Sequence, residues 1–237
     1  MELDKFYNTI RKTMTLTNEN VRGFDLILSE AEKRKVLIND LAYILATTWH
    51  ETAARMHPIA EYGKGKGRKY GVKGKYGQVP YGRGYVQLTW DFNYEKADKE
   101  LKLGGRLLKN FDLALHPDIA IPILFVGMEQ GWFTGKKLRD YIDEIDESDL
   151  EDSREYEDGR RIINGVDKKK LIATYALLFE KALKAARYGL KATQSPVEKP
   201  KDVPATIQPE VTKPPVAPLP VSTGWLDFIL KLLGIKK

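Results

Sequence analysis

The sequence contains no cysteine among its 237 residues. This absence excludes disulfide bridges, thiolate nucleophiles and zinc or iron–sulfur sites built on cysteine. No stretch reaches the roughly 18 consecutive apolar residues that a membrane-spanning helix requires. The first residues also lack a basic segment followed by an apolar one, so we expect no signal peptide and synthesis in the cytoplasm. What remains is a composition typical of globular proteins, with 42% hydrophobic and 30% charged residues.

The formal net charge of +6 conceals two segments that lack charge of one sign. Residues 62–90 contain seven basic residues and no acidic one, and glycine and tyrosine are interspersed among them. Residues 143–158 contain ten acidic residues and a single arginine. We interpret the acidic run as a solvated surface loop and the basic run as a candidate contact for an anionic partner.

Proline marks the organisation of the chain, because eight of the 12 prolines lie between Pro196 and Pro220. The surrounding stretch, residues 191–223, has no glycine and no aromatic residue, which predicts an extended linker rather than a packed core. Residues 1–190 are then the globular domain. Residues 224–237 follow the linker and form a short, very apolar segment with a basic end.

The final segment is predicted to be an amphipathic helix whose apolar residues cover more than half of a helical wheel. Such a helix can lie in a membrane interface, or it can dock on the main domain or on a partner helix. The residues expected to contact a membrane are Trp225, Phe228, Ile229 and Leu232.

The hydrophobic periodicity of residues 1–190 is mostly helical and shows neither an internal repeat nor a strand–helix alternation. We therefore expect a mainly α single domain. A long glycine-rich loop is expected over residues 57–83, followed by a short strand over residues 85–90. Helices are predicted over residues 3–14, 18–34, 41–56 (with Asn39 or Asp40 as the cap), 91–101, 117–131, 136–142 and 168–188.

Two motifs that suggest cofactors fail on inspection. His50-Glu51 begins a zinc-protease pattern, but the second histidine that the pattern needs four residues later is Ala54. The glycine-rich stretch matches neither the phosphate-binding loop nor the dinucleotide fingerprint. We therefore expect no metal, no cofactor and no nucleic-acid partner, although charge alone leaves contact with nucleic-acid phosphates open.

Two carboxylates are candidates for chemistry. Glu51 continues a helical stripe with Ile44 and Thr48, so it is expected to lose hydration, which raises the pKa of a carboxyl and suits a general acid. The alternative is a glutamate at a helix end that pairs with Arg55. Glu61 lies ten residues further along, and the neighbouring lysines are expected to keep it ionised. One protonated and one ionised carboxyl form the pair that hydrolyses glycosidic bonds, although the sequence spacing does not fix their separation.

Four segments occur in an order that resembles glycoside hydrolase family 19, in its phage and prophage endolysin branch. They are WHETAARMHPIAEYG (residues 49–63), YGRGYVQLTWDFNY (81–94), LHPDIAIPILFVGMEQGWFTGKKLRDYI (115–142) and RRIINGVD (160–167). The resemblance covers about residues 15–187. It implies a lysozyme-like, two-lobed helical domain with a central cleft that cleaves β-1,4 linkages next to N-acetylhexosamines with inversion.

The resemblance also implies roles for individual residues. It makes Glu51 the general acid and Glu61 the presumed general base, and it makes Thr89 the residue that helps hold the attacking water. Inverting enzymes need the two carboxyls roughly 6.5–9.5 Å apart to leave room for that water. Substrate contacts are expected from Gln87, Asn93 and Asn164.

Aromatic residues near these positions allow two interpretations. Tyr81, Tyr85 and Trp90 can offer flat faces to sugar rings, or they can belong to the core. We include Tyr81 and Arg83 among the candidate substrate-binding residues, and we expect Arg83 to form an ion pair inside the cleft. The sequence departs from the family pattern at Phe92, where many relatives have tyrosine, and in the loop context of Glu61. Both differences favour a substrate other than plant-type chitin.

Together these observations predict an endolysin that degrades peptidoglycan. We expect a monomer, made in the host cytoplasm, that acts in the periplasm after release through a holin and contacts a membrane through its C-terminal helix. The alternatives are a chitinase of the same family and a non-catalytic protein that binds the cell wall or a membrane.

Overall fold

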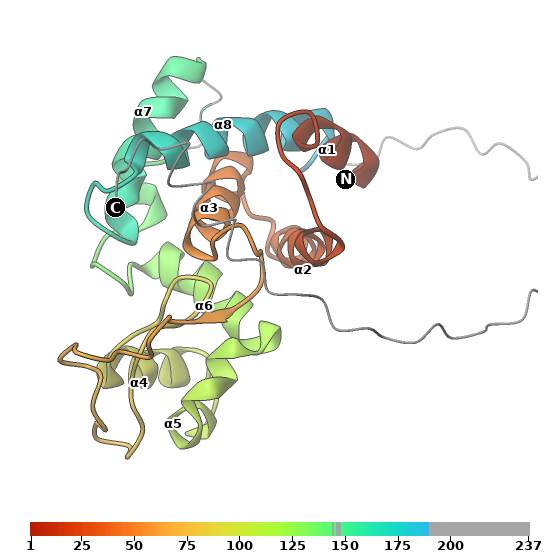
Figure 1. Ribbon diagram of the computed structural model, residues 1–237. Helices are drawn as coiled ribbons and strands as arrows, with labels where there is room; N and C mark the ends of the chain where they lie inside the picture. Colours follow the sequence, from red (N-terminus) through yellow and green to blue (C-terminus); the bar gives the residue numbers. More distant parts are fainter. Residues whose placement is uncertain (144, 146–147, 190–237) are drawn as a thin grey trace, which may run out of the picture. The chain divides into compact units, whose positions relative to one another are not determined.

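The computed structural model describes residues 1–143, 145 and 148–189 (Figure 1). These residues belong to one compact unit, Met1–Ala192. The predicted linker, residues 191–223, and the predicted C-terminal helix with Trp225, Phe228, Ile229 and Leu232 lie outside the described residues. Within the described ranges, no helix is both long enough and apolar enough to span a membrane.

The described part of the chain is mainly helical, which confirms the predicted α class. Strand is confined there to one short antiparallel pair. The elements are α1 (Leu3–Ile10), α2 (Asn18–Arg34), α3 (Ile38–Glu51), β1 (Ile59–Ala60), β2 (Arg83–Gly84), α4 (Asp91–Glu100), α5 (Arg106–Lys109), η1 (Phe111–Leu115), α6 (Pro117–Gln130), η2 (Leu138–Asp140), α7 (Asp149–Gly159), η3 (Arg160–Ile162) and α8 (Lys169–Ala185).

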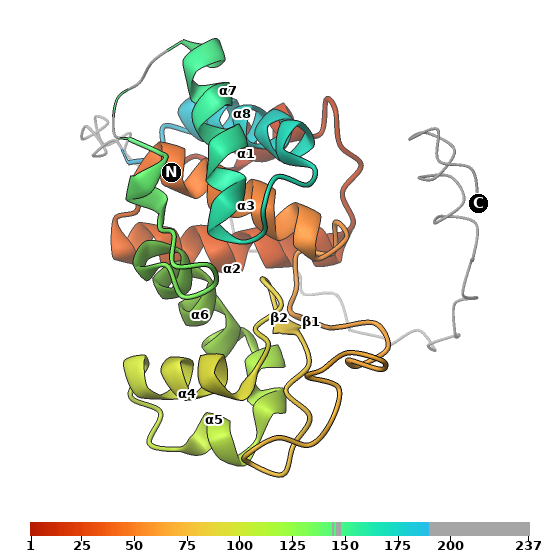
Figure 2. The ribbon, with the colours of Figure 1, turned by 90° about the vertical axis from the view of Figure 1, so that its left-hand side faces the viewer.

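Helix α3 is the centre of the larger hydrophobic core. Residues 41–48 of this helix are all buried, as expected for a helix that is covered on every side. Helix α8 packs along α3 and also contacts α1 and α7, and Figures 1 and 2 show these helices gathered around α3. Glu51 is the last residue of α3, so the larger core fixes the position of its backbone.

A smaller hydrophobic core lies among β2, α4, α5, η1 and α6. Helix α6 joins the two cores, because Leu124 and Phe125 pack in the larger one while Ile123 packs in the smaller one. The buried members of the smaller core are Leu88, Tyr94, Ala97, Leu107, Phe111, Ala114, Ile123 and Trp132.

The predicted strand over residues 85–90 is wrong. The strand lies instead at Arg83–Gly84, where Ile59 pairs with Gly84 and Ala60 pairs with Arg83. The chain then turns tightly, and the backbones of Arg83 and Leu88 exchange two hydrogen bonds of 3.1 and 2.8 Å. This turn requires a positive φ of 55° at Gln87, which a continuous strand does not allow.

The helix predicted to run to residue 56 ends at Glu51 instead. Ala53, Ala54 and Met56 all have positive φ values, between 50° and 62°, which are incompatible with a right-handed helix. Helix α2 imposes this path, because Asn20 Nδ2 donates to the carbonyl of Ala54 at 2.7 Å. A Cβ on Gly23 would fall 1.9 Å from the carbonyl oxygen of Met56, so only glycine allows this close approach.

The interpretation of residues 143–158 as a surface loop is also wrong, because most of this run forms α7. Ser148 caps the helix, since its hydroxyl and the carboxylate of Glu151 each accept a hydrogen bond from the other residue's backbone N–H. On the inner face, Tyr156 is fully buried and donates a hydrogen bond of 2.8 Å to Glu180 of α8. The many acidic residues thus masked the helical pattern in the sequence, and this segment is an amphipathic helix that packs on the larger core.

Candidate functional site

Glu51 forms an ion pair with a buried arginine. The Nη1 atom of Arg160 lies 2.6 Å from Oε1 of Glu51. The side chain of Arg160 is 2% exposed and that of Glu51 is 17% exposed, so the pair is largely shielded from water. Charge-assisted hydrogen bonds of this length are among the strongest that proteins make. One oxygen of Glu51 is therefore held, and Oε2 accepts no hydrogen bond from the described residues.

The position of the C-terminal end of α7 places Arg160 beside Glu51. Gly159 lies against the ring of Tyr43, where a Cβ would come within 3.2 Å of a ring carbon. Directly after it, Arg160 begins the turn η3 and donates from Nε to the carbonyl of Asp167 at 2.9 Å. The guanidinium is thus held by the Asp167 carbonyl on one side and by Glu51 on the other, so its orientation toward Glu51 is fixed.

Sequence reasoning did not identify Arg160 as a site residue, although it lies in the segment RRIINGVD. The partner expected from helical spacing was Arg55, and the structure pairs Glu51 with Arg160, 109 residues away. A short-range rule cannot find such a partner. The available signal was an arginine next to a glycine at the end of an acidic, amphipathic stretch.

His50 precedes Glu51 and is partly buried with it. Burial lowers the pKa of His50 below its ordinary value of 6.5, and the charge of Arg160 lowers it further, while Glu51 acts in the opposite direction. The imidazole is therefore neutral near pH 7.

Glu61 is held by donors from two different segments. It follows β1, and its backbone N–H donates to the carbonyl of Gly82 at 2.7 Å, which extends the pairing of β1 with β2. The N–H of Gly82 donates back to Oε2 of Glu61 at 3.1 Å. The hydroxyl of Tyr70 donates to Oε1 at 3.0 Å. Both carboxylate oxygens of Glu61 therefore accept a hydrogen bond.

Gln87, Thr89 and Asn93 are brought together beside Glu61. A Cβ on Gly82 would fall 2.6 Å from Oε1 of Gln87, so the amide of Gln87 packs on the same residue that binds Glu61. The Thr89 hydroxyl donates to the carbonyl of Gln87 at 2.7 Å, and Asn93 Nδ2 donates to the carbonyl of Thr89 at 2.8 Å. We call Glu61, Gln87, Thr89 and Asn93 the Glu61 cluster.

The backbone is strained at one residue of the Glu61 cluster, Gln87, and at Trp90, which follows Thr89. Gln87 has φ of 55°, and Trp90 has φ of 74° with ψ of 140°, a region that residues other than glycine rarely occupy. Such conformations cost on the order of 1–3 kcal/mol each and gather at functional sites. Trp90 is 38% exposed, and Phe92, whose ring stacks on that of Trp90, is 62% exposed.

Tyr81 and Arg83 lie in the interior of the domain. Arg83 is 4% exposed and forms its ion pair with Asp112 at 2.7 Å. Its guanidinium also stacks on the ring of Tyr81, 3.5 Å from the centroid, and donates to the hydroxyl of Tyr94. These contacts hold the turn of residues 83–88, which we call the β2 turn, on the smaller core. Tyr85 is buried as well, and burial raises the pKa of its hydroxyl. A substrate contact of Tyr81 or Arg83 stays a prediction.

Asn164 lies one turn beyond Arg160, the partner of Glu51. Its backbone N–H donates to the carbonyl of Arg160 at 2.9 Å, and the residue is exposed. Asn164 is thus tied to the backbone of Arg160, while the other predicted amides belong to the Glu61 cluster.

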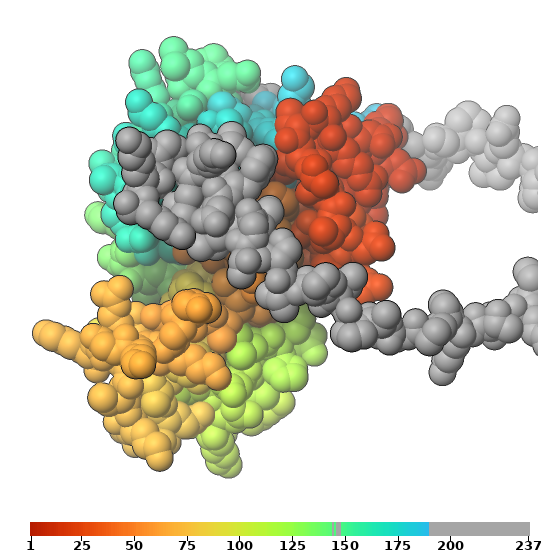
Figure 3. Space-filling model, viewed as in Figure 1, coloured from red at the N-terminus to blue at the C-terminus, as the bar shows by residue number. Residues whose placement is uncertain are grey.

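Residues 62–78, which we call the basic loop, connect Glu61 to the β2 turn. All six of its cations are exposed, and only Lys75 forms an ion pair with a described residue, Glu95, at 3.0 Å. Figure 3 shows the segment around this loop, in orange, projecting from the surface at the lower left. The exposed cations are Lys64, Lys66, Arg68, Lys69, Lys73 and Lys75.

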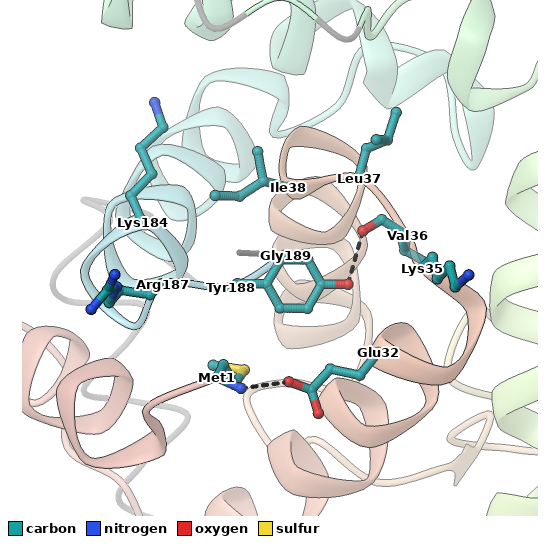
Figure 4. Close-up of a pocket in the computed structure, with 10 residues that line it drawn as sticks. All are labelled: Met1, Glu32, Lys35, Val36, Leu37, Ile38, Lys184, Arg187, Tyr188 and Gly189. Carbon is teal, nitrogen blue, oxygen red and sulfur yellow. Dashed lines mark hydrogen bonds and ion pairs between the residues drawn. The ribbon is translucent and has the colours of Figure 1, made fainter. Parts of the chain in front are cut away.

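A hollow of about 760 Å³ lies at the opposite end of α3 from Glu51 (Figure 4). Val36, Leu37 and Ile38 line it, and Tyr188 crosses it to donate a hydrogen bond to the carbonyl of Val36. None of the residues that the sequence predicts for catalysis or substrate binding line this hollow. Its size alone therefore does not make it the reaction site.

The predicted residues thus form two groups, which the short segment between α3 and β1 connects in the chain (Figure 2). Glu51 ends a helix of the larger core, Asn164 follows its partner Arg160 in the chain, and the Glu61 cluster belongs to the β1–β2 region. Comparison of the chain with family models, with curated proteins and with solved structures found no match.

Proposed function

We propose that this chain is a glycoside hydrolase that cleaves β-1,4 bonds of the bacterial cell-wall glycan by an inverting acid–base mechanism. The observation that carries the proposal is that Glu51 and Glu61, ten residues apart in the chain, have different partners. Arg160 binds Glu51, whereas Tyr70 and Gly82 bind Glu61. Two carboxylates in different environments are what this reaction requires.

In this proposal Glu51 is the general acid. Arg160 holds Oε1 of Glu51, so Oε2 is the oxygen available to the glycosidic oxygen of a bound substrate. In the acid form of Glu51 the proton lies on Oε2, while Oε1 still accepts from Arg160. The bond between the anomeric carbon and the glycosidic oxygen breaks while that proton moves to the leaving group.

Glu61 is the general base that completes the reaction. It takes a proton from a water whose oxygen forms the new bond to the anomeric carbon, on the face opposite the leaving group. The Thr89 hydroxyl, within the same cluster, donates its proton to the carbonyl of Gln87, and its oxygen can accept a hydrogen bond from that water. Exchange with solvent then returns a proton to Glu51 and removes one from Glu61. The amides of Gln87, Asn93 and Asn164 are suited to the N-acetyl and hydroxyl groups of the sugars.

The basic loop favours the cell-wall polymer over chitin. Peptidoglycan carries carboxylates on its peptide stems and on those muramic lactyl groups that bear no stem, whereas chitin is neutral. Five exposed cations without an ion pair to a described residue lie on the segment that follows Glu61 directly. Their charge attracts an anionic polymer and raises its concentration near the site.

The proposal includes the family and its architecture. The two hydrophobic cores, joined by α6, are compatible with a lysozyme-like domain of two lobes in the manner of glycoside hydrolase family 19. The protein would act as a monomeric endolysin in the periplasm after release from the cytoplasm, and residues 224–237 would contact a membrane.

Release of reducing ends from purified peptidoglycan tests the proposal. We expect Glu51→Gln and Glu61→Gln each to lower kcat by at least about a hundredfold, which is the usual contribution of a positioned acid or base. Glu100→Gln, at an exposed position of α4, is the matched control and should keep full activity. Full activity in either of the first two variants would overturn the role assigned to that glutamate.

The substrate class has its own test. Hydrolysis of chitin oligomers without hydrolysis of cell walls would make the chain a chitinase. Binding to walls without release of any sugar fragment would make it a non-catalytic wall-binding protein. The identity of the new reducing end, muramic acid or glucosamine, establishes which bond is cleaved.

A further inference from the structure

The basic loop folds back on itself and returns to Glu61. Successive backbone hydrogen bonds of 2.9 Å close its turns, from Arg68 to Gly65 and from Gly71 to Arg68. Gly65 and Gly71 then touch, because a Cβ on Gly71 would fall 1.8 Å from the carbonyl oxygen of Gly65. Only glycine permits this contact, and it brings Tyr70, which lies within the second turn, back to the beginning of the loop.

At that place the Tyr70 hydroxyl donates to Oε1 of Glu61 at 3.0 Å, while Gly82 binds Oε2. The ring of Tyr70 packs edge-on against Trp90, with the ring centroids 5.3 Å apart and the planes at 76°. Trp90 is the residue with the strained backbone at the start of α4. The ring of Tyr70 is therefore held by Trp90, and its hydroxyl is held by the Glu61 carboxylate.

We propose that Tyr70 is a positioning residue that fixes the orientation of the Glu61 carboxylate for proton transfer from water. This inference rests on the proposed function. A carboxylate held at both oxygens cannot rotate freely, so its remaining lone pairs point in fixed directions. Misplacement of a reacting group by about 1 Å can cost a hundredfold in rate, so such a constraint bears on kcat.

Tyr70 remains a hydrogen-bond donor throughout the pH range in which the enzyme would work. Burial raises the pKa of its hydroxyl, and the hydrogen bond to Glu61 raises it further. The phenol therefore keeps its proton and contributes no charge to the cluster. Its role is to direct the carboxylate, and the proton removed from water goes to Glu61.

The test compares Tyr70→Phe with Tyr62→Phe on purified peptidoglycan. Tyr70→Phe removes one hydroxyl and keeps the ring that packs on Trp90. We expect kcat to fall about tenfold to a hundredfold with KM within twofold and with an unchanged melting temperature. Tyr62 lies in the same loop and is fully exposed, so Tyr62→Phe is the control and should leave kcat unchanged.

A double variant distinguishes positioning from other effects. Because Tyr70 acts through Glu61, adding Tyr70→Phe to Glu61→Gln should lower kcat no further. An equal loss of kcat in both backgrounds would overturn the inference, as would full activity of Tyr70→Phe beside an inactive Glu61→Gln. Full activity of Glu61→Gln itself would overturn the proposed function instead, so the two failures are distinguishable.

Discussion

The two candidate carboxylates differ in where their partners come from. Glu51 ends a buried helix, and its partner, Arg160, is 109 residues away and nearly inaccessible to water. Glu61 follows a two-residue strand, and its partners, Tyr70 and Gly82, are nine and 21 residues away on loops. The packing of the larger core thus determines the surroundings of one carboxylate, and the folding of a surface loop determines those of the other.

This difference matters for what a mutation does. A substitution of the partner of Glu51 affects both stability and the reaction, because Arg160 is buried in the domain and also binds the carboxylate. A change beside Glu61 can alter the reaction with little effect on the free energy of unfolding, because the basic loop contributes little to either core. The four predictions below test this contrast, from the largest expected effect to the smallest.

The largest effect is expected for Arg160→Met, which keeps the length of the side chain but removes its charge. Loss of one partner of a buried pair should lower the free energy of unfolding by about 3 kcal/mol. Activity should fall at least about a hundredfold, since Glu51 loses its anchor. Urea denaturation and reducing-end release measure the two quantities. The neighbour Arg161 is exposed and pairs with Asp158 on the surface, so Arg161→Met should change neither.

The second prediction concerns the basic loop. Replacing Lys64, Lys66, Lys69 and Lys73 with glutamine should lower kcat/KM on peptidoglycan about tenfold at low ionic strength. The loss should shrink in 0.5 M salt, where charges are screened within a few ångströms, and it should be absent on neutral chitin oligomers. An equal loss on both substrates would show that the cations do not select an anionic polymer.

The third prediction uses the other buried arginine, Arg83. Its partner Asp112 is 61% exposed, so Asp112→Asn should lower the free energy of unfolding by less than about 1 kcal/mol. Activity should stay close to that of the unmodified protein, because the guanidinium keeps its contacts with Tyr81 and Tyr94. A large loss of activity without a loss of stability would place the Arg83–Asp112 pair in the reaction site.

The smallest effect concerns His50 and pH. Its pKa is lower in the folded protein than the ordinary value of 6.5, so the unfolded chain binds a proton more readily as the pH falls below that value. The contribution of His50 to stability is therefore complete above about pH 6.5 and is lost as the pH falls toward the folded pKa. Between pH 7.5 and 5.5, the melting temperature should fall about 1–2 °C more for the unmodified protein than for His50→Asn.

The elements that could be predicted from the sequence are those with local causes. Helix α2 begins and ends where the pattern predicted, because Thr17 and Asn20 cap it and its apolar stripe is regular. The end of α3 could not be predicted, since Asn20 and Gly23 on another helix impose the left-handed conformations after Glu51. The acidic residues of α7 concealed the inner face that carries Tyr156.

The same distinction applies to the candidate site. The motif around Gln87, Thr89 and Asn93 was identified, and short-range hydrogen bonds join these three residues to one another. Their link to Glu61 runs through Gly82, which packs on the Gln87 amide and donates to the Glu61 carboxylate. Arg160 was missed because its contact with Glu51 depends on the packing of α7 against the larger core. Tyr70 was missed because a loop rich in glycine carries no periodic signal, and its path depends on the contact of Gly65 with Gly71.

The configuration of the newly formed reducing end tests the central claim most directly. If Glu51 and Glu61 act as acid and base on opposite faces of the sugar, cleavage of a β-1,4 bond inverts the anomeric carbon. Proton NMR of a peptidoglycan fragment, recorded in the first minutes after addition of the enzyme, should therefore show the α-anomer first and the β-anomer only after mutarotation. Initial appearance of the β-anomer would contradict the account, because it requires a covalent or otherwise retaining mechanism.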